Sequence, residues 1–103
     1  MTMHTKQLII FIGGLLLCFT AVAQTFTRIA NINPTGDSGP QDLVVCNNKL
    51  YFRATNGVNG LELWVTDGTT TGTQMVKDIN PGAANGNPSA LISYNNKLYF
   101  LCQ

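Results

Sequence analysis

The acidic side chains are the groups in this 103-residue sequence with most potential for chemistry. Two carboxylates at a fixed separation can hydrolyse a glycosidic bond, and several carboxylates around one loop can bind calcium. Here the five acids are scattered along the chain: Asp37, Asp42, Glu62, Asp67 and Asp78. No two of them are placed as the paired carboxylates of a glycosidase. The case for a calcium site at Asp67, or at Asp37 and Asp42, is weak. We expect Asp67 to accept backbone N–H groups in a turn, with Gly68 at positive φ.

The histidine and the cysteines add no reactive group to this set. His4 lies in a segment that we expect to be removed, so a serine or cysteine nucleophile would lack its base. Cys46 and Cys102 lack metal-binding spacing, and two ligands are too few for a structural zinc site. A disulfide between them is permissible outside the cell, but we favour two small apolar residues in strands. The sequence predicts no catalytic, cofactor-binding or metal-binding residues, and no enzyme.

The N-terminal segment, residues 1–23, has the pattern of a secretory signal peptide. A short polar start with Lys6 precedes the apolar run Leu8–Phe19, and Ala21-Val22-Ala23 fits the small-x-small cleavage rule. The run is too short to span a bilayer of roughly 30 Å. Lipidation at Cys18 would require a small residue before it, and the residue there is a leucine. We expect cleavage after Ala23 and a secreted or cell-surface protein with no remaining membrane segment.

Composition limits the partners of the mature chain. The apolar content of 45% excludes a fully disordered chain. Once Lys6 leaves with the signal peptide, five basic residues balance five acidic ones in residues 24–103. A neutral chain lacks the basic surface that binds nucleic acid.

An internal repeat organises residues 24–103. Ile-Asn-Pro occurs at 32–34 and again at 79–81, and Asn-Asn-Lys-Leu-Tyr-Phe occurs at 47–52 and again at 95–100. The two copies of Asn-Asn-Lys-Leu-Tyr-Phe are separated by one residue more than the two copies of Ile-Asn-Pro, because one residue is inserted in the intervening loop. We call the displacement from Asn47 to Asn95 the repeat offset. Repeats of roughly 40–50 residues are typical of β-propellers or of helical arrays.

The pattern within one repeat favours β-strands. Asparagine and glycine interrupt every candidate helix, while short apolar or alternating runs are bounded by turn residues. We expect an antiparallel four-stranded meander over about 43–79, with strands at 43–46, 49–55, 61–66 and 73–79. Asn47-Asn48 is expected to form a tight turn. In the third strand, Leu61, Leu63 and Val65 should lie on one face and Glu62, Trp64 and Thr66 on the other.

Parts of two further repeats flank this meander. Thr25–Ile32 aligns with the fourth strand of the meander. Residues 91–94 and 97–102 align with its first two strands and form a partial second repeat, 91–103. Repeat arrays need roughly three units to bury a continuous core. We therefore expect truncated propeller-like blades, in an N-terminal fragment of a longer protein or in a chain that associates with itself.

The sequence from Glu62 to Ile79 resembles the ELWxxDGT repeat, also described as hyalin-like. Glu62-Leu63-Trp64 is followed by Asp67-Gly68-Thr69, by Gly72-Thr73 and by Val76-Lys77-Asp78-Ile79. The resemblance covers residues 28–102 and implies a large exported bacterial protein built from propeller-type arrays. It implies no catalytic residues.

Five side chains carry further expectations. Trp64 could stack on a sugar, but we favour a place in the core between blades, with its N–H bonded to a backbone carbonyl. Tyr51 and Tyr99 hold corresponding places in the two copies, which indicates repeated packing. Arg53 could pair with Glu62 across neighbouring strands, or both could simply be solvated.

These observations favour a non-catalytic secreted or cell-surface module for adhesion, surface structure or ligand binding. Its partner would be a surface protein, a polysaccharide, or further repeats of the same kind. The alternatives are a carbohydrate-binding propeller and part of a propeller-type glycosidase.

The signal peptide gives the first prediction. The exported protein should begin at Gln24, because signal peptidase cleaves after the small-x-small motif. The intact mass of protein captured with an antibody to residues 43–79 checks this. A mass that still includes residues 1–23 would contradict the cleavage.

Overall fold

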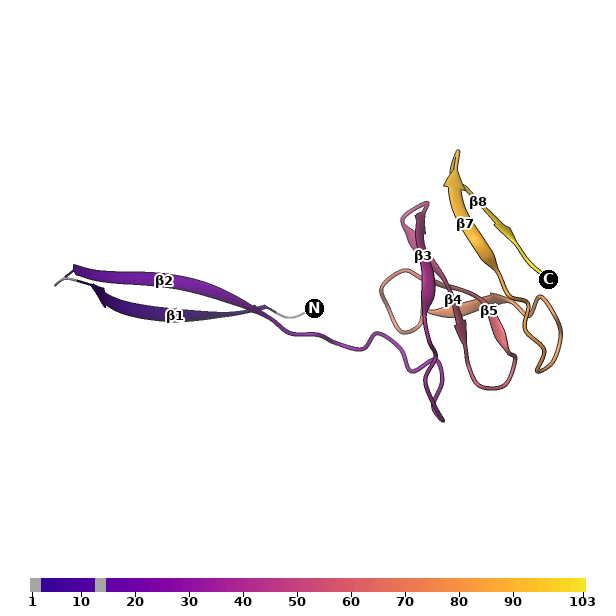
Figure 1. The fold of residues 1–103 in the computed structure, drawn as a ribbon, viewed down its shortest axis with the longest axis horizontal. Helices are drawn as coiled ribbons and strands as arrows, with labels where there is room; N and C mark the ends of the chain where they lie inside the picture. The colour runs from indigo at the N-terminus through magenta and orange to yellow at the C-terminus, as the bar shows by residue number, and fades with distance from the viewer. Residues whose placement is uncertain (1–2, 13–14) are drawn as a thin grey trace.

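The computed structural model describes residues 3–12 and 15–103, with side chains from Gln24 onward, and it is all-β (Figure 1). Its strands form three antiparallel sheets, in the orders β1-β2, β3-β4-β5-β6 and β7-β8. The strands are β1 Met3–Ile12, β2 Leu15–Gln24, β3 Gln41–Cys46, β4 Lys49–Thr55, β5 Leu61–Thr66, β6 Gln74–Lys77, β7 Ser89–Tyr94 and β8 Lys97–Leu101. The predicted all-β class is confirmed, and the described part of the chain has no helix that could cross a membrane.

The predicted signal peptide coincides with the β1-β2 hairpin, which extends away from the other sheets in Figure 1. Residues 1–2 and 13–14 of that segment lie outside the described residues. The export function of residues 1–23 stays a prediction.

The predicted meander is confirmed as the sheet β3-β4-β5-β6. β4 and β5 have the predicted bounds, while β3 and β7 each begin two residues earlier than predicted, and β6 is shorter. The strand predicted at Thr25–Ile32 is wrong, because this segment is irregular. It joins no sheet, and a strand needs a neighbouring backbone to pair with. Thr70 Oγ1, in the turn after β5, donates a hydrogen bond to the Ile29 carbonyl of this segment at 2.5 Å.

Asparagine pairs close the two hairpins that begin with β3 and β7. Asn47 and Asn48 have φ of 54° and 61°, and Asn95 and Asn96 have φ of 48° and 59°. Two central residues at positive φ define the type I′ turn, whose twist matches that of the strands it joins. The predicted tight turn at Asn47-Asn48 is therefore confirmed.

The β3-β4 and β7-β8 hairpins also share one register, displaced by the repeat offset. In the first hairpin, Gln41 lies opposite Arg53 and, after a bulge, Val44 lies opposite Tyr51. In the second, Ser89 lies opposite Leu101 and, after a bulge, Ile92 lies opposite Tyr99. The register thus reproduces the sequence repeat pair by pair.

The backbone around the two bulges matches as well. Positive φ occurs at Asp42 and Gly39 around the start of the first hairpin, and at Ala90 and Asn87 around the start of the second. Thr55 N donates to Ser38 O at 3.0 Å, and Gln103 N donates to Gly86 O at 3.0 Å. All these positions are related by the repeat offset, so the two segments follow the same path from the preceding loop to the end of the hairpin.

The meander has two faces, and β5, one of its two inner strands, is buried on both. Face A carries Phe52, Ala54 and Trp64, which pack together with Ile32, Leu50 and Met75 at their edges. Face B carries Cys46, Leu63 and Val65, which are 2–8% exposed. Residues opposite each other in antiparallel strands share a face, so the pairs Phe52–Trp64 and Ala54–Glu62 confirm the predicted alternation along β5.

The predicted burial of Trp64 is confirmed, but its predicted hydrogen bond is wrong. The side chain is 8% exposed, and its Nε1 is buried without an acceptor among the described residues. Its packing partners on face A, Phe52, Ala54 and Met75, offer apolar surface. Trp64 therefore contributes apolar contact area to the core.

The packing of face A yields a prediction about stability. Replacing Phe52→Ala should lower the free energy of unfolding by about 3–5 kcal/mol, because it leaves a cavity beside Ala54 and Trp64. The control Val58→Ala, at a residue 70% exposed, should change it by less than about 0.5 kcal/mol. Urea denaturation monitored by Trp64 fluorescence measures both. Equal losses in the two variants would contradict this core.

Candidate functional site

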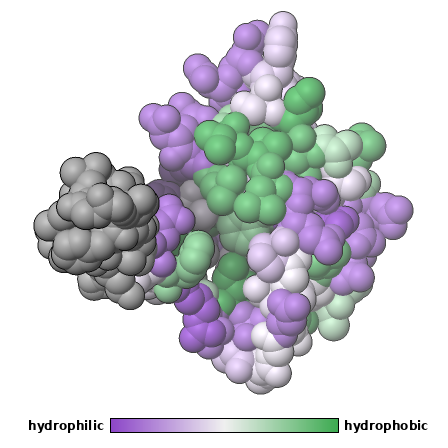
Figure 2. All heavy atoms as spheres, turned by 60° about the vertical axis from the view of Figure 1, so that its left-hand side comes forward, coloured by the Kyte–Doolittle hydropathy of each residue, from purple (hydrophilic) through white to green (hydrophobic). Residues whose placement is uncertain are grey.

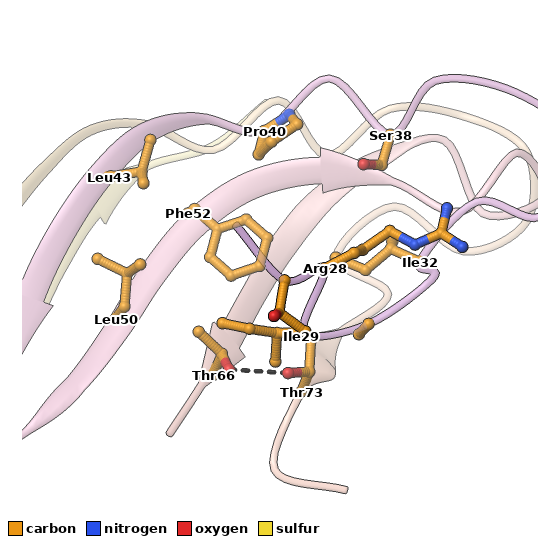
Figure 3. A pocket seen from close by; sticks show the side chains of 12 residues that line it. Arg28, Ile29, Ile32, Ser38, Pro40, Leu43, Leu50, Phe52, Thr66 and Thr73 are labelled. Atoms are coloured by element: carbon orange, nitrogen blue, oxygen red, sulfur yellow. Dashed lines mark hydrogen bonds between the residues drawn. The ribbon is translucent and has the colours of Figure 1, made fainter. Parts of the chain in front are cut away.

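An open apolar groove lies between the irregular segment 27–32 and face A of the meander (Figure 3). Its volume is about 330 Å³. Leu43, Leu50 and Phe52 line the side formed by β3 and β4, while Ile29 and Ile32 come from the irregular segment. Figure 2 shows apolar side chains gathered in a patch on one face of the molecule, bordered by hydrophilic ones.

The lining of the groove is mainly apolar. Among the described residues, its polar lining consists of Arg28, Ser38 and three threonines, and it includes no acid, histidine or cysteine. The hydroxyls of Thr66 and Thr73 lie 2.7 Å apart and bond to each other (Figure 3). Apolar side chains entering the groove would remove Leu43 and its neighbours from water, which is favourable.

The carboxylates singled out in the sequence are separated and locally bonded. Asp37 Oδ1 accepts from Gly39 N at 2.8 Å. Asp78 Oδ2 accepts from Asn59 Nδ2 and Gly82 N, both at 3.1 Å. Within the described residues, no three side chains of His, Cys, Asp or Glu come together as a metal site.

Asp67 occupies the turn position that was predicted for it. Its Oδ1 accepts from Thr69 N at 2.9 Å and from Thr69 Oγ1 at 2.6 Å, and Gly68 has φ of 95°. The hydroxyl bond from Thr69, followed by the backbone bond, lowers the pKa of Asp67 below its ordinary value of 3.8. A Cβ at Gly72 would collide with the same carboxylate, so the turn requires glycine there.

Glu62 is a charged residue that the structure buries completely. Its Oε2 accepts from Ile79 N at 2.9 Å, and its Oε1 accepts from Gly86 N at 2.7 Å. Gly86 N also lies 3.1 Å from Leu61 O. The carboxylate therefore holds both ends of the loop 79–86, which leads from the meander to β7. A Cβ at Gly86 would collide with it.

The predicted pairing of Arg53 with Glu62 is wrong, and so is the view that both are solvated. Arg53 lies opposite Leu63 and thus on face B, whereas Glu62 lies opposite Ala54 on face A. Arg53 Nη2 instead lies 3.4 Å from Asp42 Oδ2 and donates to Gln41 Oε1 at 2.5 Å.

The two cysteines differ from each other in their surroundings, and so do the two tyrosines at equivalent positions of the repeat. Cys46 is buried in β3, while Cys102 is exposed just past β8, and both are free thiols. Cys102 therefore does not lie in a strand, contrary to the prediction. Tyr51 is half-buried and Tyr99 is 50% exposed, so the equivalent tyrosines do not have equivalent surroundings.

Sequence reasoning missed two features of this region. The first is the buried anchor at Glu62, signalled only by an isolated acid within the apolar run Leu61–Val65. The second is the groove, which depends on the irregular segment folding back over face A and had no local signal in the sequence.

The comparisons supply no relative for the chain. No protein-family model, no curated protein and no solved structure matches it.

The anchor at Glu62 can be tested by removing one acceptor oxygen. Glu62→Gln should lower the free energy of unfolding by about 1–3 kcal/mol, because the amide nitrogen cannot accept from a buried backbone N–H. The control Asp42→Asn weakens a partly exposed ion pair and should cost no more than about 1 kcal/mol. Urea titration measures both, and hydrogen exchange at Gly86 N should accelerate in the Glu62 variant. Unchanged exchange there would contradict the anchor.

The turn at Asp67 gives a pH prediction. A carboxyl whose pKa is lowered by folding stabilises the protein above its unfolded pKa and loses this contribution as pH falls through the folded value. The contribution of Asp67 should therefore be present above about pH 3.8, the ordinary value, and decrease progressively as the pH falls below it. Thr69→Val should raise the pKa of Asp67 by removing the hydroxyl donor, whereas Thr70→Val should leave it unchanged, because the Thr70 hydroxyl donates to the Ile29 carbonyl instead. A carboxyl-detected NMR titration of Asp67 in the three proteins checks this, and an unshifted pKa in Thr69→Val would contradict it.

Proposed function

We propose that the chain is a non-catalytic secreted or cell-surface repeat module, built of propeller-like blades and serving adhesion, surface structure or ligand display. The observation that carries the proposal is the common register of the β3-β4 and β7-β8 hairpins, displaced by the repeat offset. Two copies of one backbone path within a short chain are what a repeat array requires.

The placement of the strands supports a blade-like arrangement. The four strands β3 to β6 are antiparallel neighbours in chain order, as in a propeller blade. The first strands of the two units, β3 and β7, lie near each other. In a propeller, the first strands of successive blades are neighbours around the central axis.

The chemistry of the described residues supports a binding rather than a catalytic role. Each of the acids Asp37, Asp42, Glu62, Asp67 and Asp78 has a local hydrogen-bond or ion-pair partner that gives it a structural use. Trp64 is buried and offers no exposed ring to a sugar. The predicted signal peptide and the resemblance to the ELWxxDGT repeat support export.

Cell fractionation tests the location. Cells making the full chain should release it to the medium or display it where added protease removes the epitope at residues 43–79. Retention of an intact, protease-protected chain inside the cells would contradict the proposal.

Activity assays test the non-catalytic role. The exported protein should bind, but not hydrolyse, members of a polysaccharide and surface-protein panel. Hydrolysis that survives in Val58→Ala but is lost in Asp42→Asn or Asp67→Asn would overturn the proposal.

A further inference from the structure

The β7-β8 hairpin carries an exposed apolar face. Ile92, Tyr94, Tyr99 and Leu101 are 59%, 65%, 50% and 67% exposed. The opposite face of the hairpin, with Leu91, Leu98 and Phe100, is half-buried. An exposed row of two aliphatic and two aromatic side chains on one hairpin is typical of an interaction surface.

The repeat offset identifies what this exposed face corresponds to. The equivalents of these four residues in the first unit belong to face B of the meander: Val44, Cys46, Tyr51 and Arg53. There they are buried or half-buried. The same face is therefore covered in the first unit and open in the second.

The structure also indicates what covers such a face. β7 lies beside β3, and the half-buried side of the hairpin is the side that packs inward. The residues on this half-buried side are Leu91, Leu98 and Phe100, which are the equivalents of Leu43, Leu50 and Phe52. One unit covers the next through two unlike faces.

The matching surface is present elsewhere on this chain. Leu43, Leu50 and Phe52 line the groove on face A, and Leu43 remains 58% exposed there. Segment 27–32, equivalent to the region of β6, already lies along one side of this groove. The open side is where the first two strands of a preceding unit would pack.

We propose that copies of this chain associate head to tail, with the β7-β8 face of one copy seated in the face A groove of the next. The occupant of the groove is a second copy, because the interface between the meander and the β7-β8 hairpin supplies the template. Each surface carries one positive charge: Arg28 is the one charged side chain among the described residues of the groove lining, and Lys97, opposite Tyr94, lies on the same face of the hairpin as the four uncharged residues. Contact between unlike faces leaves each copy with one free face, so association can continue into rings or chains.

Single lysine substitutions at exposed aliphatic residues test both surfaces. Ile92→Lys alters the hairpin face, Leu43→Lys alters the groove, and Val58→Lys is a control at a residue 70% exposed outside both. The processed full chain and each variant are compared by sedimentation velocity between about 1 and 100 μM. This range covers the micromolar dissociation constants of weak complexes.

The expected result distinguishes unlike faces from a symmetric dimer. The unaltered chain and Val58→Lys should form assemblies that grow with concentration, while Ile92→Lys and Leu43→Lys alone should stay monomeric. An equimolar mixture of these two variants should form dimers and nothing larger, because one intact face remains on each. A monomeric unaltered chain, or a mixture that stays monomeric, would overturn the proposal.

Folding of the variants is checked by circular dichroism. If Ile92→Lys unfolds, Tyr94→Lys replaces it, since Tyr94 belongs to the same face and is 65% exposed. Assembly that persists in a folded Tyr94→Lys protein would equally contradict the proposal.

Discussion

Burial of β5 on both faces is the constraint on which the rest of this structure depends. Trp64 and Glu62 on face A and Leu63 and Val65 on face B are all buried. A single sheet cannot exclude water from both of its faces, so each face needs a separate cover. The β7-β8 hairpin approaches the meander at β3, and segment 27–32 lies over part of face A. The meander is thus stable only as a layer between neighbours, and the groove marks the part of face A left uncovered.

Glu62 connects this layer to the next one. Its carboxylate receives backbone N–H groups from Ile79 and Gly86, at the two ends of the loop that leads to β7. A buried carboxylate is costly unless donors surround it, and here backbone donors provide that compensation. The position of the second hairpin therefore depends on a residue within the central strand of the first. This coupling helps to explain how the two hairpins can follow one backbone path although β3 and β7 differ at most positions.

Local patterns in the sequence were sufficient to predict the strands and turns, because Asn47-Asn48 and the alternation in β5 act over a few residues. The failures concern interactions between distant residues. Thr25–Ile32 has strand-like composition, but this segment is irregular and belongs to no sheet. Arg53 and Glu62 are on neighbouring strands but on opposite faces, a consequence of register that charge alone does not reveal. The groove and the anchor at Glu62 require the loop and the irregular segment to fold back over the sheet.

The equivalence of the two hairpins is most directly tested by cross-strand NOEs in the processed protein. We expect backbone contacts between Val44 and Tyr51 and between Ile92 and Tyr99, with a bulge preceding each pair. Contacts between β3 and β7 should accompany them. A second hairpin shifted by one residue, with Ile92 opposite Leu98, would exchange its two faces. That result would contradict both the repeated unit and the stacking of unlike faces.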